Sequence, residues 1–163
     1  MPKVAVIMGS VSDLDVVKPA IDILKKFDVE VEARVISAHR TPDDAHQFAV
    51  NALKNNIEVI ICAAGKAAHL GGVIAAYTPL PVIGLPVKSS TMDGLDSLLS
   101  MVQMPSGIPV ACVAINGSQN AGLLAVQMLS LKYPQLIEKM QDYKRSLAEK
   151  IKSDDEKLQK ELN

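Results

Sequence analysis

The sequence predicts an α/β fold with a five-stranded, doubly wound parallel sheet in three αβα layers and a long C-terminal helix. Two patterns predict it. Short runs rich in Val, Ile and Ala recur along the chain, and segments with apolar residues at spacings of three and four lie between them. Because 163 residues suffice for one such unit, we expect a single domain, with an αβα core over residues 1–133 and an amphipathic helix over 134–163.

Five segments are predicted as strands. Four are apolar at nearly every position, as is typical of central parallel strands covered on both faces: 3–8, 57–64, 81–87 and 108–115. The segment 29–36 alternates polar and apolar residues, which predicts an edge strand. Strands and helices alternate throughout, so right-handed crossovers are expected.

The first two helices follow the strands directly. Their apolar faces are formed by Leu14, Val17, Ile21 and Leu24, and by Ala45, Phe48, Ala49 and Ala52. Ser12, three residues before Asp15, resembles the start of a capping box, and Thr41 followed by Pro42 predicts the start of the second helix.

The segment after Pro134 is predicted to be one long amphipathic helix. Its apolar stripe consists of Leu136, Met140, Tyr143, Leu147, Ile151, Leu158 and Leu162. A helix of this length reaches beyond a globule of this size, so we expect it to cover a neighbouring subunit of a homo-oligomer.

Composition excludes several classes of partner. Lys plus Arg is 17 and Asp plus Glu is 18, which leaves no basic excess for a nucleic acid or an anionic membrane. Aromatic residues are 3% of the chain, too few for a base-stacking platform. Cys62 and Cys112 lie in separate apolar runs, and neither a secretory leader nor a membrane span is recognisable. We therefore expect free thiols and a cytoplasmic protein.

The ligand site is expected at the carboxyl ends of the strands, in the loops 9–13, 37–42, 65–72, 88–97 and 116–121. In the first of these, Ser10 and Ser12 either hold an anion at a helix start or act as simple caps. The glycine and lysine pattern of ATP and dinucleotide loops does not occur, so neither ligand is indicated.

The imidazole of His39 can exchange protons near neutral pH. The guanidinium of the adjacent Arg40 can bind a phosphate or carboxylate through two parallel hydrogen bonds. The alternative is a His bonded within its turn and an Arg paired with a surface carboxylate. For His69 a local contact at the helix start is favoured, and His46 is expected to be solvated. No histidines have metal-ligand spacing, so we expect no metal.

Five motifs, in order and over nearly the whole chain, resemble those of the PurE family: GSVSD at 9–13, SAHRTP at 37–42, AGKAAHL at 64–70, GLDSLLSMVQMPSGIPV at 94–110 and NAGLLA at 120–125. The resemblance implies a flavodoxin-like fold, a homo-octamer, and conversion of N5-carboxyaminoimidazole ribonucleotide to its 4-carboxy isomer in purine biosynthesis, with free CO2 between the steps and no metal, ATP or organic cofactor. Lys66 and Gly71 stand where the family usually has Gly and Pro.

Carried onto this chain, the resemblance implies that His39 is the general acid and base. Substrate-binding residues are expected at Ser10, Ser12, Asp13, Ser37, Arg40, Ala64, Gly65, Ala67, His69 and Leu70. Within that set, Arg40, Ser10 and Ser37 suit the phosphate and Asp13 suits the ribose hydroxyls. The small residues at 64, 65, 67 and 68 would line a water-poor CO2 pocket with His69 at its edge.

Two other functions are compatible with this fold. One is a carboxylase that uses CO2 directly at the same site, although SAHRTP and AAHL are more similar to the mutase class. The other is a flavodoxin-like binding or electron-carrying module without catalysis, against which the lack of Trp and the few Tyr residues count.

Overall fold

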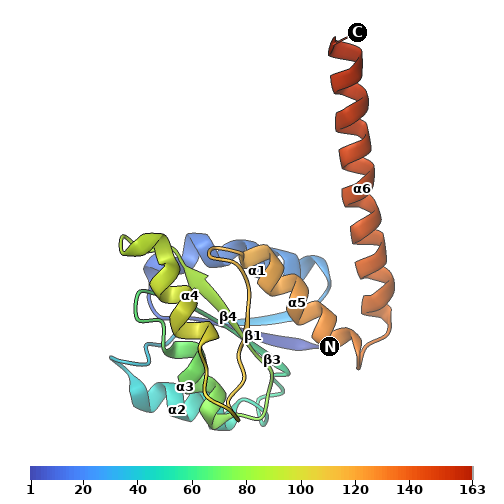
Figure 1. Ribbon diagram of the computed structural model, residues 1–163. Coiled ribbons are helices and arrows are strands. Elements are labelled where there is room, and N and C mark those ends of the chain that lie inside the picture. The colour runs from blue at the N-terminus through green and yellow to red at the C-terminus, as the bar shows by residue number, and fades with distance from the viewer. Residues whose placement is uncertain (163) are drawn as a thin grey trace.

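The computed structural model describes residues 1–162 and contains a five-stranded sheet in the order β2-β1-β3-β4-β5 (Figure 1). All strand pairs are parallel. The strands are β1 (Lys3–Met8), β2 (Glu30–Val35), β3 (Val59–Gly65), β4 (Val82–Val87) and β5 (Ala111–Cys112). The α-helices are α1 (Leu14–Lys26), α2 (Pro42–Asn51), α3 (Leu70–Tyr77), α4 (Leu95–Val102), α5 (Ser118–Ser130) and α6 (Gln135–Leu162).

Helices cover both faces of the sheet, which confirms the predicted three-layer, doubly wound fold. One hydrophobic cluster joins the sheet to α1, α5 and the start of α6, and a second joins it to α2, α3 and α4 (Figure 1). β1, β3 and β4 are buried almost throughout, whereas β2 lies at an edge, as its alternating pattern predicts.

The fifth strand differs from the prediction. It was expected to be a central strand over 108–115, but it pairs with β4 only at Ala111 and Cys112 and forms the second edge. The carbonyls of Gly84 and Pro86 both accept hydrogen bonds from the segment after β5, so both residues face it. Because Pro86 has no N–H to donate in return, the ladder with β5 stays short.

The start of α1 also differs from the expected capping box. The Oγ of Ser10 accepts a hydrogen bond from the N–H of Ser12, within a single 3₁₀ turn (Val11–Asp13) that precedes the helix. α1 itself begins at Leu14 with no side-chain cap, and the Leu14 side chain is exposed. The serine pair therefore belongs to the loop above β1.

α1 and α5 approach closely because of two small residues. A Cβ on Gly122 would lie 2.2 Å from Ile23 Cγ2, so only glycine fits there. The buried Ser118 accepts a hydrogen bond from the N–H of Ala20 at 3.0 Å and donates to the carbonyl of Val17 at 3.2 Å. These bonds satisfy the α1 backbone beside Pro19, which interrupts the helical ladder.

α6 is a single helix that rises away from the core, with its far end distant from the sheet (Figure 1). Of the predicted apolar stripe, only Leu136 and Met140 are buried, and Tyr143 meets Phe27 edge-on with ring centroids 5.8 Å apart. The remainder of the stripe is exposed: Leu147, Ile151, Leu158 and Leu162. Residue 163 of the predicted helix lies outside the described residues.

The connection between α5 and α6 is held by Glu58 at the beginning of β3. Its Oε2 accepts a hydrogen bond from Lys132 Nζ at 2.7 Å, and its Oε1 accepts one from the Tyr133 hydroxyl at 2.8 Å. Burial alone would raise the pKa of Glu58, but these bonds outweigh it and the pKa is lowered. The carboxylate thus ties the segment between α5 and α6 to the residue that precedes β3. No helix within residues 1–162 combines the length and apolarity that crossing a membrane requires.

Candidate active site

A cavity of about 600 Å³ lies at the carboxyl ends of β1 to β4. Its lining includes the predicted acid and base and all the predicted substrate-binding residues: Ser10, Ser12, Asp13, Ser37, His39, Arg40, Ala64, Gly65, Ala67, His69 and Leu70. Ala68, which was expected to line the CO2 pocket, is instead buried in the core beneath it. The loop 116–121 does not reach the lining, because β5 lies at the sheet edge.

The two imidazoles of the cavity form a pair. His39 Nε2 lies 3.0 Å from His69 Nδ1, and the rings meet nearly at right angles, with an interplanar angle of 86°. His39 stands in the turn between β2 and α2, and His69 immediately precedes α3. His69 makes no side-chain cap bond, so the expected local contact at the helix start is wrong. A hydrogen bond at this distance requires one of the two nitrogens to carry the proton and the other to accept it.

Arg40 connects the loops above β1 and β2. Its Nη2 donates to the carbonyl of Gly9 at 2.9 Å, and its Nε donates to Ser37 Oγ at 3.3 Å. Ser37 Oγ also accepts the Arg40 N–H at 3.2 Å, and Thr41 bonds back to the Ser37 backbone, which closes the turn around His39. Arg40 has no ion-pair partner among residues 1–162, so the expected alternative, a surface carboxylate, is not found.

The loop above β1 presents hydroxyls and one carboxylate. Ser12 Oγ donates to Ser10 Oγ at 2.9 Å. Burial raises the pKa of Asp13 above its ordinary value, although hydrogen bonds with Ser10 and Ser12 act in the opposite direction. Among the described residues, Asp13 is the only acidic one that lines the cavity, and its partly buried carboxylate can accept a hydrogen bond from a ligand hydroxyl.

Two lysines of the lining were missed as candidates. Lys66 adopts φ +56°, in the left-handed region that costs an L-residue energy and that glycine takes freely. Lys88 follows β4, and its Nζ lies 3.2 Å from Asp93 Oδ1. The signal that would have found them is their place in the loops 65–72 and 88–97, at the carboxyl ends of predicted strands.

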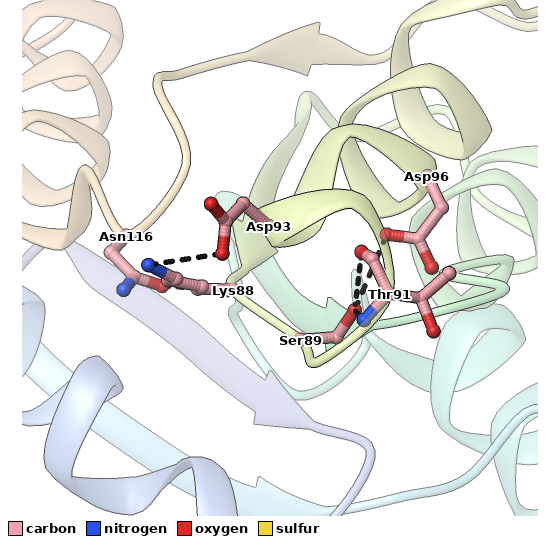
Figure 2. A network of polar contacts seen from close by, with 6 residues as sticks. All are labelled: Lys88, Ser89, Thr91, Asp93, Asp96 and Asn116. Carbon is pink, nitrogen blue, oxygen red and sulfur yellow. Dashed lines mark hydrogen bonds and ion pairs between the residues drawn. The ribbon is translucent and has the colours of Figure 1, made fainter.

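The loop between β4 and α4 is organised by polar contacts (Figure 2). Asn116 Oδ1 accepts the N–H of Lys88 at 2.8 Å, so the loop 116–121 acts on the cavity indirectly. Ser89 Oγ donates to the Thr91 carbonyl at 3.1 Å, lies 3.3 Å from Asp96 Oδ1, and accepts the Thr91 N–H at 3.2 Å (Figure 2). This network sets the position of Lys88 and Ser89 at the cavity wall.

The third histidine and the two cysteines lie outside the cavity lining. His46 is exposed, as expected, and the edge of its ring contacts Tyr77, with centroids 4.5 Å apart. Cys62 is buried and Cys112 half-buried, both as free thiols, and burial raises the pKa of each. Over the described part of the chain, no cluster of three or more His, Cys, Asp or Glu side chains is placed to hold a metal ion.

Fold and site together define an α/β protein with a cavity at the carboxyl edge of its parallel sheet, lined by a pair of imidazoles. The AIR carboxylase family model matches residues 3–150, and the chain belongs to this family. The predicted resemblance to PurE proteins is thereby confirmed.

The relatives agree with this assignment. The chain is 57% identical over 147 residues to an N5-carboxyaminoimidazole ribonucleotide mutase of Pyrococcus abyssi, covering 90% of this chain and 84% of that protein. Its identity to the mutase of Thermotoga maritima is 54%, over 93% of this chain and 88% of that protein. The crystal structure of Treponema denticola PurE superposes with a TM-score of 0.88 at 31% identity, covering 97% of this chain and 99% of that one.

Proposed function

We propose that this protein converts N5-carboxyaminoimidazole ribonucleotide to 4-carboxyaminoimidazole ribonucleotide, as the relatives' names describe for them. The observation that carries the proposal is the His39–His69 pair, at 3.0 Å, in a cavity whose size suits a nucleotide. The reaction is an isomerisation, so it consumes no second substrate and needs only proton transfer and retention of CO2.

His39 performs both proton transfers in this proposal. In the first half, the bond between N5 and the carboxylate carbon breaks, CO2 leaves, and protonated His39 delivers a proton to the nitrogen. In the second half, C4 attacks CO2, and neutral His39 removes the C4 proton to restore the aromatic ring. One imidazole thus ends each turnover as it began, and the atoms and charges balance. His69, bonded to His39, orients the ring for both transfers.

The same proposal assigns the other cavity residues to the phosphate, the ribose and CO2. Arg40, Ser10 and Ser37 bind the phosphate, which remains unchanged throughout the reaction. Asp13 accepts hydrogen bonds from the ribose hydroxyls, because a carboxylate beside the phosphate would be repelled. The small residues Ala64, Gly65 and Ala67 hold CO2 where water has little room.

Two observations favour the mutase over the other functions that the sequence left open. The relatives described above are named mutases, which disfavours direct carboxylation by CO2. The cavity lining contains no Phe or Tyr, so a flavin would have no aromatic side chain to stack on.

We also infer assembly into a homo-oligomer, most simply the octamer that the PurE resemblance implies. The exposed apolar stripe of α6 supports this inference, because such a stripe is normally covered. Two free thiols are consistent with a reducing cytoplasm.

The decisive experiment mixes the purified protein with N5-carboxyaminoimidazole ribonucleotide, without ATP or bicarbonate, and follows the 4-carboxylate. Formation of product at a rate that depends on the protein supports the mutase. If product forms only from aminoimidazole ribonucleotide and added bicarbonate, the protein is a carboxylase and the mutase proposal is wrong. His46→Asn, which alters a histidine outside the cavity, is the matched control and should retain full activity.

A further inference from the structure

Lys66 and Lys88 occupy neighbouring positions at the ends of paired strands. The register of β3 and β4 pairs Gly65 with Val87, and each lysine is the next residue along its strand. Both lysines line the cavity, each at the carboxyl end of its strand.

Arg40, by contrast, belongs to the opposite half of the cavity. It bonds to Gly9 and Ser37, in the loops above β1 and β2, while the lysines follow β3 and β4. The sheet order β2-β1-β3-β4 separates these two positively charged regions. The His39–His69 contact joins the β2 loop to the β3 loop and therefore lies between them.

The ammonium groups of Lys66 and Lys88 are only weakly neutralised by other side chains of the described chain. Lys66 is exposed and has no ion-pair partner in the described part of the chain. Within residues 1–162, Lys88 forms an ion pair only with Asp93, and their side chains are 57% and 86% exposed. An exposed pair of this kind contributes little to stability and is readily exchanged for another anion.

We propose that Lys66 and Lys88 form a second anion subsite, which binds the carboxylate that the substrate carries, opposite the phosphate subsite at Arg40. The proposal rests on the proposed function, whose nucleotide bears a phosphate at one end and a carboxylate at the other. It assigns the two ends to the two positively charged regions, with the imidazoles at the reacting atoms between them. Of the two lysines, Lys66 is the stronger candidate for a ligand-binding role. Its backbone is held at φ +56°, where glycine would be unstrained, and such strain is typical of functional sites.

Lys88 reaches the carboxylate by leaving Asp93. Asp93 has φ +55° and is followed by Gly94 at φ +95°, so the loop that presents this carboxylate is a tight left-handed turn. Asp93 therefore competes with the ligand for Lys88. Removing its charge with Asp93→Asn, a residue that tolerates this backbone conformation, should strengthen binding of the carboxylated nucleotide.

The test compares two nucleotides that differ only in the carboxylate. Affinities for 4-carboxyaminoimidazole ribonucleotide and for aminoimidazole ribonucleotide are measured by calorimetry for the wild type, Lys66→Gly, Lys66→Arg and Lys88→Met. Lys54→Met removes the same charge from an exposed residue outside the cavity and controls for net charge. Lys66→Gly also relieves the strained backbone, so thermal unfolding should show it folded and at least as stable as the wild type.

We expect Lys66→Gly and Lys88→Met to bind the carboxylated nucleotide about fivefold to tenfold more weakly and aminoimidazole ribonucleotide as the wild type does. Lys66→Arg and Lys54→Met should keep the wild-type preference. Equal losses for both nucleotides, or no loss in either lysine variant, would overturn the carboxylate subsite while leaving the mutase proposal intact. A wild type that binds neither nucleotide would overturn both.

Discussion

His39 Nε2 and His69 Nδ1 lie 3.0 Å apart across the cavity, although 30 positions separate the two residues in the chain. Each imidazole comes from a different βα loop, so the contact exists only because β1 and β3 are neighbours and β2 lies beside β1.

His39→Asn should keep the fold and nucleotide affinity but lower kcat by about 10² to 10⁴, because the amide retains size and polarity without proton transfer. Steady-state kinetics and a binding isotherm with the 4-carboxy product measure the two effects separately. A variant with near wild-type kcat would exclude His39 as the acid and base.

His69→Asn and His69→Ala test how the second imidazole acts. The Asn amide can reach the position of Nδ1 and keep a hydrogen bond to His39, whereas Ala leaves the His39 ring unsupported. We expect kcat to fall by about tenfold in the Asn variant and by about 10² in the Ala variant, as for loss of positioning by a misplaced group. Equal and complete loss in both would instead mean that His69 itself transfers a proton, which the pH dependence of kcat would reveal as a changed profile.

Arg40→Lys should raise KM more than it lowers kcat. The phosphate is the same in substrate and transition state, so its binding acts on both alike. Lysine keeps the charge but cannot also bond to Gly9 and Ser37, and the turn around His39 should loosen slightly. Affinities for the phosphorylated product and its nucleoside provide the check. If the variant discriminates between them as strongly as the wild type does, Arg40 does not bind the phosphate.

Removing residues 148–163 should reduce the assembly without unfolding the core. This truncation keeps the buried Leu136 and Met140, which a cut after Tyr133 would remove, and deletes the exposed Ile151, Leu158 and Leu162. Light scattering is expected to show a smaller particle than the full chain, with an unchanged circular dichroism melt of the αβα core. An unchanged particle mass would show that α6 does not hold the subunits together.

Glu58→Gln should lower stability at pH 7 by about 1 kcal/mol, as for partly solvated hydrogen bonds. Because the pKa of Glu58 is lowered in the folded state, its contribution is complete above the unfolded pKa of about 4.3 and is lost as the pH falls through the folded value. The difference between variant and wild type should therefore shrink below about pH 4. Urea unfolding at pH 7 and pH 3.5 measures it, with the exposed Glu149→Gln as control. An equal difference at both pH values would contradict the charge-dependent role.

The sequence by itself predicted the strands β1 to β4 and much of the cavity lining, although it missed the short β5 and the place of Lys66 and Lys88. Apolar runs without interruption identified β1, β3 and β4, alternation identified the edge strand β2, and the strand-end rule placed His39, Arg40 and Asp13 in one cavity. These features follow from periodicity and from the parallel direction of the strands, both of which are readable along the chain.

Only the tertiary structure decided which loops meet. The short β5 depends on Pro86 facing it, the His39–His69 contact depends on strand order, and Lys66 stands beside Lys88 because Gly65 pairs with Val87. The same holds for Ser10, whose hydroxyl serves a 3₁₀ turn rather than α1. The local hydrophobic pattern specifies whether a segment is a helix or a strand. Strand register and side-chain partners depend on packing between segments that lie far apart in the chain, so no single stretch of sequence encodes them.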